Sequence, residues 1–223
     1  FTVEWVFIKR FRTGTAGKPD CNRRPVLGNR LRLFCSGNAV EDIIMISLSD
    51  LRKFKAEGRK FSCLTCYDAS MAKAMELAEI DMILIGDSLG MAIQGRDSTL
   101  PVTVEDMAYH TAAVRRGNSH ALIMTDLPFM SYATLEDGLK NAKAVMQVGA
   151  QMVKIEGGAW LGELVQVLTR NGIPVCVHLG LTPQSVHVFG GYKLQARTRE
   201  AADQLIADCQ AAVDAGAAVL LLE

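Results

Sequence analysis

The sequence lacks the features that mark several large classes of protein. No apolar run in its 223 residues approaches the roughly 18 residues that a membrane-spanning helix needs. Lys and Arg balance Asp and Glu, 24 against 24, so the basic excess typical of nucleic-acid binding is missing. No Gly-x-Gly-x-x-Gly turn follows the first predicted strand, which argues against a dinucleotide site. We therefore expect a cytoplasmic protein without a nucleic-acid or membrane partner.

Cysteine is scattered, and only Cys63 and Cys66 have the spacing of a redox or zinc pair. They lie in a predicted strand, where residues an odd number apart point to opposite faces. No second pair has metal-ligand spacing. The interpretation we favour is buried thiols in a reducing compartment.

Residues 1–45 differ from the rest of the chain. Up to residue 40, eight Lys and Arg side chains face only two acids, Glu4 and Asp20, and no periodicity is sustained. Two interpretations stay open: an Arg-rich targeting extension, which would make the protein mitochondrial, or sequence that carries no fold information. We expect 1–45 to be a disordered or artefactual extension and 46–223 to form a partial barrel catalytic domain.

From residue 46 onward, apolar runs alternate with amphipathic segments. Strands are predicted at 61–67, 81–87, 121–126, 151–156, 173–178 and 217–223, and helices at 49–57, 68–79, 103–116, 134–148, 159–170 and 199–215. Strands that are apolar on both faces and separated by helices indicate a parallel sheet. The fold expected is an α/β (β/α)8 TIM barrel, with a doubly wound sheet as the alternative.

The predicted strands end on polar side chains. Four of them finish on an acid and one on a histidine: Asp87, Asp126, Glu156, Glu223 and His178. Lys154 lies two residues before Glu156, so both are expected to face the barrel interior. Because ligands bind at the carboxyl ends of barrel strands, these side chains predict a polar site. A hard cation would hold the acids together.

Only six strands are predicted, whereas a complete barrel has eight and about 250 residues. We therefore expect a barrel truncated after its sixth strand, with the first and sixth strands as open edges.

Seven motifs resemble the ketopantoate hydroxymethyltransferase family. They occupy 86–91 (GDSLGM), 98–103 (STLPVT), 109–116 (YHTAAVRR), 126–129 (DLPF), 153–158 (VKIEGG), 178–185 (HLGLTPQS) and 189–193 (FGGYK). The resemblance implies a barrel of the phosphoenolpyruvate/pyruvate superfamily. It also implies transfer of a one-carbon unit from 5,10-methylenetetrahydrofolate to 3-methyl-2-oxobutanoate, giving 2-dehydropantoate for pantothenate and coenzyme A synthesis. We expect a Mg²⁺-dependent homo-oligomer that binds a small keto-acid.

The resemblance also implies a role for each site residue. Asp87, Asp126 and Glu156 correspond to the metal site, and Asp87, Ser88, Asp126 and Lys154 to the substrate contacts. Glu223 corresponds to the base that removes the C3 proton, Lys154 to the residue that stabilises the enolate, and His178 to a residue near the new hydroxymethyl group. The loop 189–192 is expected to cover the site.

Two other hypotheses are retained. A lyase or phosphonomutase of the same superfamily would also use acids at strand ends around magnesium. The other hypothesis is a non-catalytic association module, which would bind neither magnesium nor keto-acid.

Overall fold

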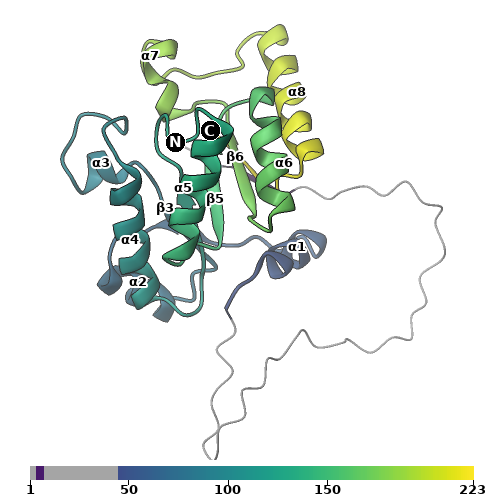
Figure 1. Ribbon diagram of the computed structural model, residues 1–223. Helices are drawn as coiled ribbons and strands as arrows, with labels where there is room; N and C mark the ends of the chain where they lie inside the picture. The colour runs from purple at the N-terminus through teal and green to yellow at the C-terminus, as the bar shows by residue number, and fades with distance from the viewer. Residues whose placement is uncertain (1–3, 8–44) are drawn as a thin grey trace, which may run out of the picture.

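The computed structural model describes residues 4–7 and 45–223 and is built on a seven-stranded sheet (Figure 1). Six strands run parallel and neighbour one another in chain order. They are β2 (Cys63–Thr65), β3 (Met82–Ile85), β4 (Leu122–Asp126), β5 (Met152–Glu156), β6 (Val175–Leu179) and β7 (Val219–Leu222). This order is that of successive βα units, so the predicted α/β fold with barrel-type strand order is confirmed.

The helices that follow these strands lie on one face of the sheet (Figure 1). They are α2 (Ala69–Leu77), α4 (Val104–Gly117), α5 (Leu135–Gln147), α6 (Gly162–Arg170) and α8 (Arg199–Ala215). All five lie within predicted helical segments or extend them by one residue. The predicted helix at 159–170 begins as a short 3₁₀ turn, η1 (Ala159–Leu161). Three short elements were not predicted, because three or four residues carry no measurable periodicity: α3 (Leu89–Ala92), η2 (Pro183–Ser185) and α7 (Val186–Phe189).

Local capping sets the helix starts. Thr103 and Asp106 form the reciprocal capping box expected before α4, with Thr103 accepting from the Asp106 backbone and Asp106 from the Thr103 backbone. Thr134 accepts from the backbone of Asp137 before α5. Each cap satisfies N–H groups that the first turn leaves without a partner.

The two faces of the sheet belong to two separate cores. Alternate strand residues such as Ile83, Ile123 and Val153 pack against the helices. The intervening residues pack inside the curved sheet, where α1 (Leu48–Ala56) closes its end with Leu51 and Phe54. The interior strand residues are Met82, Leu122, Met124, Met152, Cys176, Val219 and Leu221. Because side chains alternate along each strand, the interior row continues to the carboxyl ends, where the polar residues lie.

The two cysteines at redox spacing lie in different cores. Cys63 packs with the interior cluster and Cys66 with the cluster under the helices, as the strand period requires. Both are free thiols. Burial, and to a smaller extent the charge of Asp126, raises the pKa of Cys63 to about 12, so its reactive thiolate is suppressed. The thiols therefore act as small apolar side chains.

One sheet edge differs from expectation. The strand β1 (Glu4–Phe7) pairs antiparallel with β7, with Glu4 opposite Leu222 and Phe7 opposite Val219. The prediction that the sixth parallel strand is an open edge is therefore wrong. An unpaired edge presents a row of N–H and C=O groups that an extended segment can bind.

The rest of 1–45, apart from residue 45, lies outside the described residues. No described helix is long and apolar enough to cross a membrane.

A close contact between α2 and α4 supplies a stability prediction. A Cβ at Gly117 would lie 2.2 Å from the backbone oxygen of Ala69. Gly117→Ala is therefore expected to lower the free energy of unfolding by about 1–3 kcal/mol, measured by urea denaturation. Gly162, whose added Cβ would meet nothing within 4 Å, is the matched control. Equal stability of the two alanine variants would contradict this packing.

Candidate active site

The sheet register brings the predicted polar residues side by side. Asp126 pairs directly with Lys154 across β4 and β5, and Glu156 pairs directly with His178 across β5 and β6. All four lie at the carboxyl ends of their strands and are almost completely buried. Since Asp126, Lys154, Glu156 and His178 continue the interior rows of their strands, they face the same space inside the curved sheet.

Lys154 lies between two carboxylates. Its Nζ is 2.7 Å from Asp126 Oδ1 and 3.5 Å from Glu156 Oε1. Burial alone would lower the pKa of Lys154, but the charges of Asp126, Glu156 and Asp87 outweigh it and raise that pKa above its ordinary value. The interior lysine is therefore paired and stays an ammonium ion, a fixed positive charge for an anionic group.

Asp87 and Asp126 form a second, less compensated pair. The backbone N–H of Asp87 donates to Asp126 Oδ2 at 3.1 Å. Burial, followed by the charge of Asp126, raises the pKa of Asp87 to about 7. Burial also raises the pKa of Asp126, although the Lys154 ammonium opposes that shift. Two carboxylates this close and this buried repel each other unless a proton or a cation lies with them.

His178 lies between two glutamates. Its Nδ1 is 3.1 Å from Glu156 Oε1, and its Nε2 is 3.3 Å from Glu223 Oε2. Burial alone would lower the pKa of His178, but its contacts with Glu156 and Glu223 raise it. The backbone of Glu223 is also held, because its N–H donates to Leu179 O and its C=O accepts from Leu181 N.

Ser88 lies at the start of α3 but does not cap it with its side chain. Its Oγ is 2.9 Å from the hydroxyl of Tyr67, and Ser88 itself is exposed. The hydroxyl therefore faces the mouth of the site beside Asp87. Tyr67 was not predicted as a site residue, because the sequence shows it only as the end of a strand.

Two further residues complete the buried network. Gln184 contacts Asp87 and Glu156, and Tyr132 contacts Gln184 and the backbone of Glu156. Gln184 lies in the recognised motif 178–185, so that motif was its only sequence signal. Nothing in the sequence marks Tyr132, which belongs to the loop between β4 and α5.

The acids fit a magnesium ion in part. Asp87 and Asp126 offer adjacent, hard oxygen ligands with incomplete charge compensation, which suits magnesium. Glu156 is differently engaged, since Oε1 faces Lys154 and His178 while Oε2 accepts from the Gln184 backbone. Burial would raise the pKa of Glu156, but Lys154 and His178 lower it. Within 45–223, no three His, Cys, Asp or Glu side chains are arranged to hold a metal.

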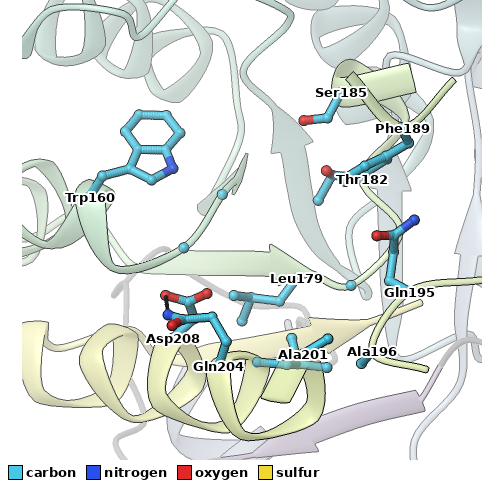
Figure 2. A pocket seen from close by; sticks show the side chains of 14 residues that line it. Trp160, Leu179, Thr182, Ser185, Phe189, Gln195, Ala196, Ala201, Gln204 and Asp208 are labelled. Carbon is cyan, nitrogen blue, oxygen red and sulfur yellow. Dashed lines mark hydrogen bonds between the residues drawn. The ribbon is translucent and has the colours of Figure 1, made fainter. Parts of the chain in front are cut away.

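A cavity of about 380 Å³ adjoins this network on the helix side. Gly157 and Gly158 line it directly after Glu156, and Leu179 and Gly180 line it directly after His178. Figure 2 shows Trp160 and Phe189 on opposite sides of this pocket, with Asp208 reaching toward it from α8.

The predicted covering loop reaches the neighbourhood of the site from α7. Phe189 lines the adjoining cavity, and the Tyr192 hydroxyl lies 3.8 Å from Met91 Sδ in α3. The loop thus extends from β6 toward the helix that follows Ser88. Covering of the site by this loop stays a prediction.

Comparison with known proteins identifies the family. Residues 45–223 match the family model described as ketopantoate hydroxymethyltransferase. The chain belongs to this family. Over 179 residues it is 92% identical to 3-methyl-2-oxobutanoate hydroxymethyltransferase of Acinetobacter baumannii strain AYE and 64% identical to that of Psychrobacter sp. strain PRwf-1. In both comparisons 80% of this chain is covered, and the chain spans 66% of the relative's length.

Solved structures support the fold of the family. A 2,3-dimethylmalate lyase, described as a PEP mutase/isocitrate lyase superfamily member, aligns with a TM-score of 0.56 at 17% identity, covering 76% of this chain and 61% of its own. A phosphonopyruvate hydrolase in complex with oxalate and Mg²⁺ aligns with a TM-score of 0.59 at 13% identity, covering 76% and 60%. At such identities the likeness shows a shared fold alone.

Proposed function

We propose that this chain carries the catalytic residues of a 3-methyl-2-oxobutanoate hydroxymethyltransferase that uses 5,10-methylenetetrahydrofolate as donor. The product would be 2-dehydropantoate, for pantothenate and coenzyme A synthesis. The family match supports the reaction class, and one observation carries the chemistry. A lysine ammonium and a Glu–His–Glu array surround the same buried space as two adjacent aspartates. Enolate chemistry needs these three functions: a base, a positive charge and an orienting proton donor.

The residues divide the reaction as follows. Glu223, the least buried of the acids, removes the C3 proton of the keto-acid. The electron pair of that C–H bond passes into the enolate, whose oxygen the Lys154 ammonium stabilises. The C3 carbon then forms a bond to the one-carbon unit, the two C–N bonds that hold this unit to the folate break, and a water molecule supplies the oxygen of the new hydroxyl. The two folate nitrogens take up the proton held by Glu223 and one proton of that water, so tetrahydrofolate leaves and Glu223 becomes a carboxylate again. His178, between Glu156 and Glu223, orients that hydroxyl and exchanges its proton.

Asp87 and Asp126 are the residues that would hold magnesium in this proposal. When bound, the ion supplies Lewis acidity and a template for the keto and carboxylate oxygens of the substrate. Glu156 instead holds Lys154 and His178 in place through one oxygen. Ser88 and Tyr67 present hydroxyl groups at the mouth, where the substrate carboxylate would enter.

The test requires a chain of the relatives' length. We define the extended chain as this sequence joined to the part of the Acinetobacter baumannii relative that it does not span. With magnesium present, it is expected to form 2-dehydropantoate from 3-methyl-2-oxobutanoate and 5,10-methylenetetrahydrofolate. Mass spectrometry measures the 2-dehydropantoate formed. Cleavage of a C–C or C–P bond without use of the folate donor would favour a lyase or phosphonomutase instead. Failure to bind either keto-acid or magnesium would favour the association module.

The metal assignment gives a prediction for two variants. In the extended chain, Asp87→Asn and Asp126→Asn are each expected to weaken magnesium binding by at least ~10-fold, because each replaces a charged ligand with a neutral amide. Isothermal titration measures this loss, and hydroxymethyl transfer at limiting magnesium is expected to fall with it. Asp203→Asn, at an exposed position on α8, is the matched control. Unchanged magnesium affinity in both site variants would refute the assignment.

Cytoplasmic location and assembly as a homo-oligomer stay predictions, as does the use of 5,10-methylenetetrahydrofolate as co-substrate.

A further inference from the structure

Gln184 contacts the segments that end three of the strands, two through its side chain and one through its backbone. Its Nε2 donates to Asp87 Oδ2 at 2.8 Å and to the Leu127 carbonyl at 3.0 Å. Its backbone N–H donates to Glu156 Oε2 at 3.0 Å. One residue in the loop after β6 therefore ties together the segments that end β3, β4 and β5.

Tyr132 fixes the orientation of the Gln184 amide. The Tyr132 hydroxyl donates to Gln184 Oε1 at 2.6 Å and lies 3.2 Å from both the backbone N and O of Glu156. With Oε1 held by a hydroxyl donor, the NH₂ group must face the Asp87 carboxylate and the Leu127 carbonyl. The reversed amide would place its oxygen against two acceptors, leaving three acceptors without a shared proton.

The network is buried and specific. Gln184 and Tyr132 are both 7% exposed, so neither side chain can exchange these partners for bulk water. The amide satisfies one oxygen of Asp87 without adding charge, whereas a lysine there would compete with a cation. At the same time, the backbone N–H occupies the oxygen of Glu156 that does not face Lys154 and His178.

We propose that Gln184, oriented by Tyr132, is a positioning residue that holds the Asp87 carboxylate for magnesium and the Glu156 carboxylate for Lys154 and His178. This inference rests on the proposed function, since it assigns Asp87 to the metal. Gln184 thus contacts both Asp87, an acid assigned to the metal, and Glu156, the acid that binds Lys154 and His178. Partners that orient metal ligands in this way typically change metal affinity or activity by 10–100-fold when removed.

The experiment compares Gln184→Ala, Gln184→Glu and Tyr132→Phe in the extended chain. Magnesium affinity is measured by isothermal titration, transfer by steady-state kinetics, and folding by the melting temperature. Gln184→Ala is expected to weaken magnesium binding about 10–100-fold. Gln184→Glu is expected to weaken it further, because the new carboxylate faces Asp87 and the Leu127 carbonyl. Gln210→Ala, at an exposed position on α8, is the matched control.

The double variant separates positioning from a general effect on stability. Tyr132→Phe is expected to weaken magnesium binding severalfold in the unaltered background and to have no further effect when Gln184 is alanine, because Tyr132 acts through the amide. Independent, multiplicative effects of the two substitutions would overturn the proposal. So would an unchanged magnesium affinity in Gln184→Ala, whatever its melting temperature.

Measuring both magnesium affinity and hydroxymethyl transfer also separates this inference from the proposed function. If the unaltered extended chain binds magnesium but transfers no hydroxymethyl group, the proposed function fails while the coupled loss of magnesium affinity still supports the Gln184 assignment. If the unaltered chain transfers the group and Gln184→Ala keeps both wild-type kinetics and magnesium affinity, the function stands and the Gln184 assignment fails. If the unaltered chain binds no magnesium, the Gln184 assignment is overturned.

Discussion

Replacing Glu223 by glutamine in the extended chain is expected to abolish exchange of the C3 proton of 3-methyl-2-oxobutanoate with solvent deuterium. An amide of the same shape cannot accept that proton, and loss of a general base costs about 10²–10⁴ in rate. Binding of the keto-acid with magnesium is expected to persist, because Asp87, Asp126 and Lys154 are unchanged. Proton NMR in D₂O follows the exchange, and isothermal titration follows binding.

The control for this variant is Glu200→Gln, at an exposed position in the first turn of α8. Exchange in the control is expected to match the unaltered chain. If the Glu223 variant exchanges the C3 proton at the unaltered rate, the base is another residue. His178, only 3.3 Å away, would then be the first candidate, and His178→Gln would test it.

Replacing Lys154 by methionine is expected to have the largest effect on stability. Asp126 and Glu156 would keep their buried positions without the ammonium that lies 2.7 and 3.5 Å from them. Removing one partner of a buried ion pair costs about 3–5 kcal/mol, because the remaining charge stays desolvated. Urea denaturation of the extended chain measures this loss. Hydroxymethyl transfer is expected to fall below detection, since the enolate oxygen loses its fixed positive charge.

Magnesium distinguishes the two consequences of this substitution. Added magnesium is expected to restore part of the lost stability, because a cation at Asp87 and Asp126 compensates some of the same negative charge. It is not expected to restore transfer. Lys140→Met, at an exposed position on α5, is the control and is expected to be as stable as the unaltered chain. Unaltered stability in Lys154→Met would show that the acids are compensated by other groups.

The main part of the fold was open to prediction because its signals are local. Each parallel strand is an apolar run, and four of the five helices that follow the strands begin at a capping side chain, α6 being the exception. These patterns depend on neighbours within a few residues. The covered edge of β7 was missed because Glu4–Phe7 is paired with residues more than two hundred positions away. Such a pairing depends on available backbone groups rather than on side chains.

The sequence predicted where the site residues lie but not all of their contacts. Asp126, Lys154, Glu156 and His178 could be placed on one face, because residues two apart in a strand share a face and parallel strands share a carboxyl end. The hydrogen bond that Glu156 Oε2 accepts from the backbone of Gln184 could not be predicted, because Gln184 is 28 positions away along the chain.

By itself, the sequence determined the α/β class, the order of strands and helices, and the set of charged residues at the strand ends. Those properties follow from hydrophobic periodicity, capping residues and composition, which are properties of local sequence. Only the tertiary structure decided which acid pairs with which cation, including the pairing of Glu156 with Lys154 and His178. It also decided that Tyr132 and Gln184 connect the strand ends. Such pairings are set by distances of about 3 Å between segments far apart in sequence, and hydrogen-bond and ion-pair energies depend steeply on those distances.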